Sequence, residues 1–341
     1  MKGRASMKTG PWLHRFAVFT ASCTFLLVIA GGLVTSTGSG LAVPDWPLSY
    51  GQLMPPMVGG IFYEHGHRMI ATFVGVLTVV LAVWLWRAED RRWLRIVGIC
   101  ALLAVIVQGV LGGLTVLFLL PTWISLLHAT IAQSFFALTV FIALATSQGW
   151  RAMEPRDLPS ASKTRKRAVA ATGVILLQLV LGAWMRHSDA GLAIPDFPLA
   201  YGALVPSIDD AMLMEVNESR VESGLAPVDR GQIWVHYLHR LGAVLVLIVV
   251  YRLVHHLLKS YGDEARLREP AIVLTTLVLM QALLGALTVW TGKGVEIATA
   301  HQATGALVLG LSALVTARVL RLFPVPARST TYSSLPSPLR P

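Results

Sequence analysis

Four histidines at matching places in the two halves of this 341-residue chain point most directly to chemistry. His67 and His128 lie in the first half, and His239 and His301 lie in the second. All four fall inside apolar stretches, where an ionisable side chain is costly and is usually functional. Two imidazoles without cysteines or clustered carboxylates nearby complete neither a tetrahedral nor an octahedral metal shell. They do suit the two axial positions of a haem iron, so the sequence predicts one haem-type site in each half.

The histidines belong to an internal repeat. The segment GLAVPDWPLSYG at 40–51 returns as GLAIPDFPLAYG at 191–202, with nine of the twelve positions identical. Three more matched pairs follow in the same order: EHGHR at 64–68 with HYLHR at 236–240, QGVLGGLTV at 108–116 with QALLGALTV at 281–289, and LHAT at 127–130 with AHQAT at 300–304. The order of these pairs predicts two similar halves.

A carboxyl group accompanies only one of the histidine pairs. Glu64 precedes His67 by three residues, and the equivalent residue of the second half is His236. A helical spacing of three places Glu64 on the same face as His67. Its carboxyl group could act as a general acid or base, or it could simply orient an imidazole. The asymmetry makes the first half the candidate catalytic half.

Two arginines directly follow candidate ligands. Arg68 comes after His67, and Arg240 comes after His239. A guanidinium at the mouth of each site could pair bidentately with a haem propionate, or it could snorkel to the membrane interface. Glycines in the spans could leave room for a flat macrocycle, although close helix packing explains them equally well. They are Gly75, Gly109, Gly112, Gly113, Gly242 and Gly285.

The elements that must position these residues are membrane helices. Apolar residues make up 55% of the chain and charged residues 13%, against about 25% charged in an ordinary soluble domain. Backbone polar groups in hydrocarbon must be satisfied within their own segment, so the apolar runs predict helices. The predicted class is an all-α membrane protein with eight transmembrane helices. The spans are 14–35, 63–86, 94–117, 124–147, 168–186, 234–257, 270–291 and 298–320.

The distribution of positive charge predicts the orientation. Of the 28 Lys and Arg residues, 22 fall on one side of the membrane, which the positive-inside rule makes cytoplasmic together with both termini. All four histidines then lie near the exterior ends of their helices. The net charge of +10 thus reflects topology, and no basic stripe interleaved with aromatics indicates nucleic acid.

An even number of spans in each half predicts two parallel, pseudo-symmetric four-helix bundles. In such a bundle the second and fourth helices are diagonal neighbours, so their histidines can face each other across the core. The predicted domains are an N-terminal bundle at 1–150, a cytoplasmic linker at 151–167, a C-terminal bundle at 168–322 and a tail at 323–341. The acidic loop 203–233 predicts a short surface helix.

These motifs in this order closely resemble the haem A synthase family, membrane enzymes of cytochrome oxidase assembly. The resemblance covers about residues 14–320. It implies oxidation of the C8 methyl group of haem O to a formyl group, through hydroxylated intermediates, to give haem A. Some family members carry a cysteine pair in the first exterior loop. Residues 36–62 contain no cysteine, so the chain looks like a member of the cysteine-free branch.

The resemblance also implies roles for individual residues. His239 and His301 correspond to the axial ligands of a retained haem b, and His67 and His128 to the pair that holds the substrate haem. Glu64 corresponds to a residue needed for the chemistry. The implied partners are haem O, a haem O synthase that delivers it, an unidentified electron donor or acceptor, and the lipid bilayer. A homo-oligomer is left open, and the expected location is the bacterial plasma (inner) membrane.

Two other functions compete with the enzyme. A two-haem cytochrome b-type electron carrier uses the same four histidines, but it has no evident need for Glu64 at one iron only. A transporter with parallel repeats predicts helices broken at the midplane, whereas the polar residues of this chain cluster toward one end of the spans.

Overall fold

The computed structural model describes residues 11–156, 158 and 160–325. Within these residues every regular element is helical, and isolated bridges occur only in the loops that carry the repeated motif. The helices are α1 (Pro11–Ser36), α2 (Gly60–Ala88), α3 (Arg92–Leu117), α4 (Thr122–Thr146), α5 (Gln148–Arg151), α6 (Ala161–His187), α7 (Asp210–Glu222), α8 (Arg230–Tyr261), α9 (Ala265–Trp290) and α10 (Val295–Leu322), with the short 3-10 helix η1 (Ala190–Leu192).

Eight of these helices are long and apolar enough to cross a membrane, which confirms the predicted class. The shortest has 25 residues, and at about 1.5 Å per residue it exceeds the roughly 30 Å hydrocarbon thickness. All eight long helices begin two to seven residues before the predicted spans, and the largest difference is at α6. Helix α6 begins at Ala161 rather than 168, because its first two turns carry basic residues and continue the helix beyond the apolar stretch. An apolar window detects the span and misses such an extension.

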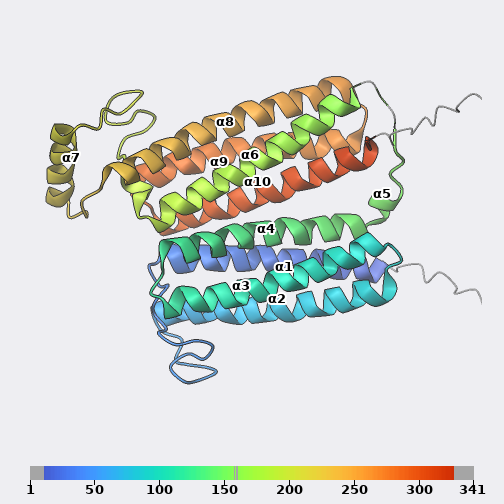
Figure 1. Ribbon diagram of the computed structural model, residues 1–341, viewed down its shortest axis with the longest axis horizontal. Coiled ribbons are helices and arrows are strands. Elements are labelled where there is room, and N and C mark those ends of the chain that lie inside the picture. Colours follow the sequence, from blue (N-terminus) through green and yellow to red (C-terminus); the bar gives the residue numbers. More distant parts are fainter. Residues whose placement is uncertain (1–10, 157, 159, 326–341) are drawn as a thin grey trace, which may run out of the picture.

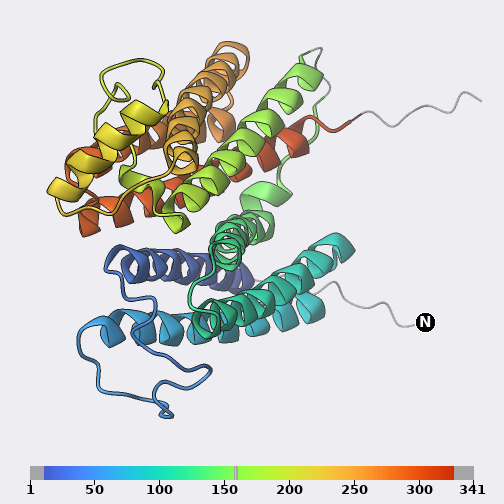
Figure 2. The same cartoon turned by 60° about the vertical axis from the view of Figure 1, so that its left-hand side comes forward.

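The long helices pack as two groups of four (Figures 1 and 2). In the first group α1 packs on α2, α2 on α3, α3 on α4, and α4 closes on α1. In the second, α6, α8, α9 and α10 close in the same cyclic order. Helices α2 and α4 are therefore diagonal, as are α8 and α10. This packing is consistent with the predicted pair of four-helix bundles.

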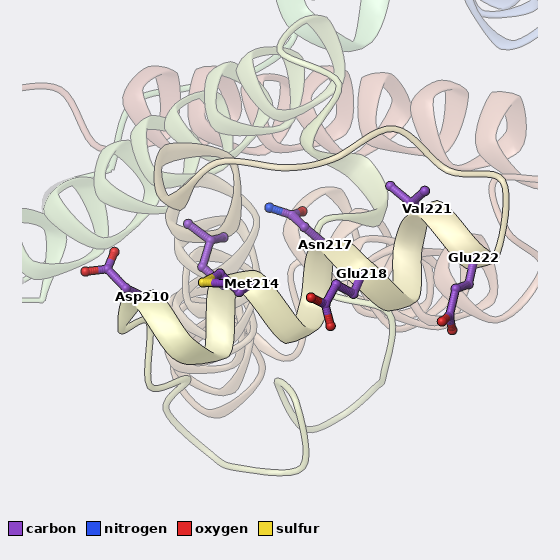
Figure 3. Close-up of a pocket in the computed structure, with 7 residues that line it drawn as sticks. Asp210, Met214, Asn217, Glu218, Val221 and Glu222 are labelled. Carbon is purple, nitrogen blue, oxygen red and sulfur yellow. The ribbon is translucent and has the colours of Figure 1, made fainter.

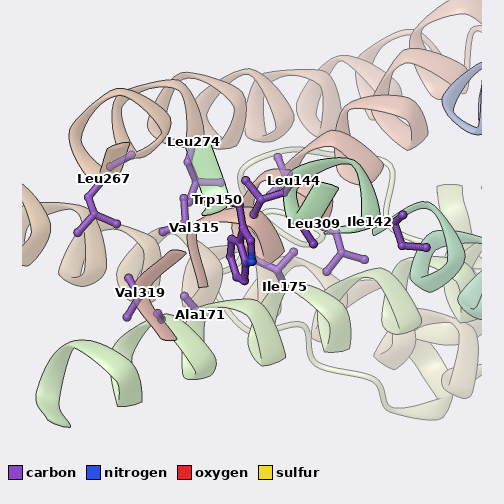
Figure 4. Close-up of a cluster of buried hydrophobic side chains, with 14 of the residues drawn as sticks. Ile142, Leu144, Trp150, Ala171, Ile175, Leu267, Leu274, Leu309, Val315 and Val319 are labelled. Carbon is purple, nitrogen blue, oxygen red and sulfur yellow. The ribbon is translucent and has the colours of Figure 1, made fainter. Parts of the chain in front are cut away.

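The two groups meet along a seam where α10 packs against α1 and α4, and α4 packs against α6. The core runs through this seam without interruption. Figure 4 shows Ile142 and Leu144 of α4 near Ile175 of α6 and Leu309 of α10. The halves are thus joined by a continuous apolar interface, which fixes one histidine pair relative to the other.

The loop between α6 and α8 contains α7, which confirms the short surface helix predicted for 203–233. Asp209 caps its first turn by accepting a hydrogen bond from the Met212 backbone N–H at 2.8 Å. A hollow lies beside this helix, and all of its lining residues come from α7, as the side chains drawn in Figure 3 show. A surface lined by one helix encloses no ligand, so we assign it no function.

Glu89 follows the C-terminus of α2, at the end of the first bundle opposite the repeated loops. The carboxylate is buried and accepts hydrogen bonds from Arg91 Nε at 2.8 Å and from Arg151 Nη2 at 3.1 Å. Arg91 also donates to the Ala145 carbonyl of α4 at 2.9 Å. Burial disfavours the charged form of Glu89, but its hydrogen bonds and the charges of Arg91 and Arg151 outweigh burial and lower its pKa to about 2.

Replacing Glu89 with glutamine should destabilise the protein by roughly 1–3 kcal/mol at neutral pH, because both arginines lose a charged partner. A carboxyl group whose pKa is depressed in the folded state stabilises fully above its ordinary pKa of 4.5 and loses that contribution as the pH falls toward about 2. The difference in melting temperature between wild type and Glu89→Gln should therefore shrink between about pH 7 and about pH 3. A difference that stays constant over this range would contradict the assignment.

Candidate functional site: two histidine pairs under matched loops

The structure brings together each predicted pair of histidines. His239 of α8 and His301 of α10 have ring centroids 6.5 Å apart and planes inclined at 81°. In the first half, His67 of α2 and His128 of α4 are close enough to interact electrostatically. A metal–imidazole bond is about 2 Å long and the ring centre lies about 1 Å behind the ligating nitrogen, so two axial imidazoles put their centres about 6 Å apart. The spacing of the second pair fits this arrangement.

A glycine from a neighbouring helix lies against each of the four rings. A Cβ added to any of these glycines would meet the Cε1 atom of the histidine at 2.9–3.3 Å, which is tighter than ordinary contact. The four contacts are Gly31 with His67, Gly112 with His128, Gly182 with His239, and Gly285 with His301. The repeat therefore includes the contact at the edge of each ring, and a larger residue at these positions requires the ring to shift.

Several ring nitrogens of these histidines are buried without a partner. Nδ1 of His67, His128 and His301 has no hydrogen-bond partner among the described residues, whereas Nδ1 of His239 contacts the Gln178 amide at 3.1 Å. The described residues contain no group of three or more His, Cys, Asp or Glu side chains that could hold a bare metal ion. Paired imidazoles with unsatisfied nitrogens fit an iron whose remaining ligands come from a macrocycle.

The glycine contacts give a prediction for the second pair. Gly182→Ala would place a methyl group 2.9 Å from His239 Cε1, so we expect the ring to move and haem content to fall several-fold. Gly173→Ala on the same helix is the matched control, because a Cβ there meets nothing within 4 Å. Haem per protein, measured from the pyridine haemochrome spectrum, should fall only in the first variant. Equal haem content in both would show that the glycine is not needed.

Glu64 and Arg68 connect α2 to the loop between α1 and α2, which carries the first copy of the repeated motif. Glu64 accepts a hydrogen bond from the Val43 backbone N–H at 2.8 Å and pairs with Arg68 at 2.6 Å. Arg68 also donates to the carbonyl oxygens of Asp45 at 2.7 Å and Leu48 at 2.9 Å. The carboxyl group is buried, but its hydrogen bonds go to the loop and to Arg68 rather than to His67.

The second half repeats this connection with a neutral residue. Both ring nitrogens of His236 lie against donors, Nδ1 at 3.2 Å from the Ile194 backbone N and Nε2 at 3.2 Å from Arg240 Nε, and a neutral imidazole accepts a hydrogen bond from one of the two. Arg240 donates to the Leu199 carbonyl at 2.7 Å. Glu64 and His236 therefore hold equivalent loops, and the carboxyl group is the chemical difference between the sites. Pairing of Arg68 and Arg240 with propionates stays a prediction.

The loops that carry the repeated motif have the same internal structure. Asp45 accepts from the backbone N–H groups of Tyr50 at 2.6 Å and Gly51 at 2.8 Å, and the Gly51 bond leads in lowering its pKa. Asp196 is held in the same way by Tyr201 and Gly202, and these bonds outweigh burial to lower its pKa.

Aromatic residues fix the loops against the helices. Trp46 lies directly over Gly113 of α3, where an added Cβ would come within 2.5 Å of the indole. Phe197 packs on Trp290 of α9 with ring centroids 5.8 Å apart. These contacts hold the two loops over the ends of the helix bundles.

Some contributions to the site are absent from the sequence predictions. His65 is buried and hydrogen-bonded to Ser49 at 2.8 Å, so it tethers the first loop. The sequence predictions do not include Gly31 and Gly182. The 151 residues that separate them equal the separation of the repeated loops, so the repeat itself indicates that the two glycines are equivalent. Arg186 of α6 donates to the Gly32 carbonyl of α1 at 3.0 Å, and no local motif in the sequence indicates this contact.

Together, the fold and the site define a class: a multi-pass helical membrane protein with two repeated halves, each holding a histidine pair suited to a metalloporphyrin. The sequence profile of the COX15-CtaA family, described as cytochrome oxidase assembly protein, matches residues 14–60 and 57–313. The chain belongs to this family.

Curated relatives cover nearly the whole chain. The heme A synthase of Lysinibacillus sphaericus is 27% identical over 308 residues, which is 89% of this chain and 94% of the relative. That of Geobacillus kaustophilus is 26% identical over 328 residues, 94% and 96% of the two chains. That of Listeria monocytogenes is 28% identical over 297 residues, 85% and 90%.

Proposed function

We propose that this protein is a haem A synthase, an oxidoreductase that converts the C8 methyl group of haem O to a formyl group through hydroxylated intermediates. Relatives that carry this name align with 85–94% of the chain. The observation that carries the proposal is the pair of equivalent histidine sites, of which, among the described residues, only one has a buried carboxyl group, Glu64. A pure electron carrier has no use for that asymmetry, so the carrier is not favoured.

The proposal gives the two halves different tasks. Residues 168–322 form the half in which His239 and His301 hold a resident haem b, which supplies electron transfer when bound. Residues 1–150 form the half in which His67 and His128 hold the substrate haem O. Support comes from the 6.5 Å separation of the second pair and from the glycine behind each ring. The polar segment 151–167 joins the halves, and 323–341 is the tail.

The role of Glu64 follows from where its atoms lie. One carboxylate oxygen accepts the Val43 N–H and the other pairs with Arg68, so the group is held in one orientation at the exterior end of α2. A fixed, buried carboxyl group beside a reacting substrate can take or return a proton at its oxygen. Arg68 stabilises the charged form through their ion pair, and the carboxyl group is buried.

The proposal includes a location and partners. The concentration of Lys and Arg on one side supports cytoplasmic termini and histidine sites that face the exterior of a bacterial inner membrane. The porphyrin and its isoprenoid tail are largely apolar, so haem O can enter sideways from the bilayer. A haem O synthase that delivers it and a redox protein that exchanges electrons complete the expected set of partners.

The deciding experiment is mass-resolved chromatography of haems extracted from the protein after co-expression with an enzyme that makes haem O. Haem A, or its hydroxylated precursor, beside haem B would support the synthase. Haem B alone, with haem O present in the cells, would favour the two-haem electron carrier. A protein with no haem would overturn both functions.

A further inference from the structure

Arg186 is a buried arginine at the seam between the two halves. It lies at the exterior end of α6 and donates to three neutral groups on two other helices. Its guanidinium bonds to the Gln302 amide oxygen of α10, to the Gly32 carbonyl of α1 at 3.0 Å and to Ser36 Oγ at 2.8 Å. Thr299 of α10 also donates to Ser36, at 3.1 Å. This network ties α6 and α10 to α1.

Two residues of this network are sequence neighbours of residues in the two histidine sites. Gln302 follows His301, a proposed ligand in the second half. Gly32 follows Gly31, which lies against the His67 ring. An added Cβ on Gly32 would meet Thr299 at 3.2 Å and Gln302 at 3.4 Å, so α1 and α10 are in close contact at this level. A displacement of Arg186 would therefore change the helix packing at both histidine sites.

The charge of Arg186 is not balanced locally. An arginine remains protonated in proteins, and the bonded partners of Arg186 within the described part of the chain are an amide, a carbonyl and a hydroxyl. Charges interact strongly over several ångströms in a low-dielectric interior. The first half has Thr35 at the equivalent place in the repeat, so this charge distinguishes the second half. A positive charge near an iron favours the reduced state, which carries less positive charge.

We propose that Arg186 is a positioning residue that couples the two histidine sites. It holds the His301 helix against the α1 surface behind His67, and its charge raises the reduction potential of the haem in the second half. The inference rests on the proposed function, because it requires a haem between His239 and His301. A raised reduction potential favours the reduced state of that haem. The Arg186 network also connects that haem physically to the proposed substrate site.

The test is an optical redox titration of the haem-loaded protein, purified from cells that make no haem O. Arg186→Gln should lower the midpoint potential so that reduction becomes at least about tenfold less favourable, which is 59 mV for a one-electron couple. Arg186→Lys retains the charge and should retain most of the potential. Arg220→Gln is the control, because Arg220 binds the Leu192 carbonyl at 2.7 Å and lies outside the seam.

A second variant keeps the test valid if Arg186→Gln does not assemble. Gln302→Glu places a carboxylate against Arg186 with almost no change in shape, so the seam persists while the charge is neutralised, and the potential should fall again. Variants that bind haem with an unchanged potential, even with lowered melting temperatures, would make Arg186 a structural clamp and overturn the inference alone. A wild-type protein without haem would overturn the proposed function and this inference with it.

Discussion

His301→Ala should leave the purified protein almost without resident haem. Loss of a residue that merely orients a metal ligand costs about 10–100-fold in affinity, so loss of a ligand itself should cost at least that much. The alanine also removes the ring that faces His239 at 6.5 Å, and a single imidazole then remains on that side of the bundle. Haem b per protein, measured from the pyridine haemochrome spectrum, is the readout.

His128→Ala is the matched control, because His128 occupies the equivalent place in the first half. It should leave haem b in the protein and abolish conversion of haem O. Loss of haem b in His128→Ala but not in His301→Ala would exchange the proposed tasks of the two halves. Full haem b content in both variants would contradict ligation of haem b by His301.

Glu64→Gln should lower haem A formation by about 10²–10⁴-fold, the usual contribution of general acid–base catalysis, while haem b content stays unchanged. Glutamine has almost the same shape, and its amide oxygen can still accept the Val43 N–H. It cannot exchange a proton, and it loses the charge that pairs with Arg68 at 2.6 Å. The measurement is the ratio of haem A to haem O in extracts of cells that also make haem O.

The alternative role of Glu64 is to tether the loop between α1 and α2. His236→Gln tests it, because His236 holds the equivalent loop through Ile194 and Arg240 without a carboxyl group. We expect His236→Gln to retain most of the activity. Similar losses in both variants would show that attachment of the loops, rather than the Glu64 carboxyl group, is what the reaction requires.

Much of the architecture could be predicted because it depends on local composition. An apolar run in a bilayer must form a helix, so the eight spans follow from hydrophobicity alone. The repeat then predicted which spans carry equivalent residues, and the pairing of His239 with His301 followed from the cyclic packing of four helices. The start of α6 was wrong by seven residues, because its first turns are helical but basic.

The loop contacts were harder to predict because they join segments far apart in the chain. Spacing along α2 placed Glu64 beside His67, yet the carboxylate bonds to Val43, 21 residues away, and to Arg68. The repeated aspartates gave no indication that they close their own loops by binding backbone N–H groups five and six residues on. Such hydrogen bonds depend on how the loop folds back over the bundle.

The sequence by itself determined the membrane class, the two halves, and the four histidines together with the single carboxyl group that distinguishes one half. Only the tertiary structure decided what surrounds them: the glycine behind each ring, the loops held by Arg68 and Arg240, and the seam joined by Arg186. Hydrophobicity and periodicity act along one segment and are visible in its residues. The partners of a buried charge are chosen by helices that meet only after packing, and Arg186 reaches Gly32 across 154 positions of the chain.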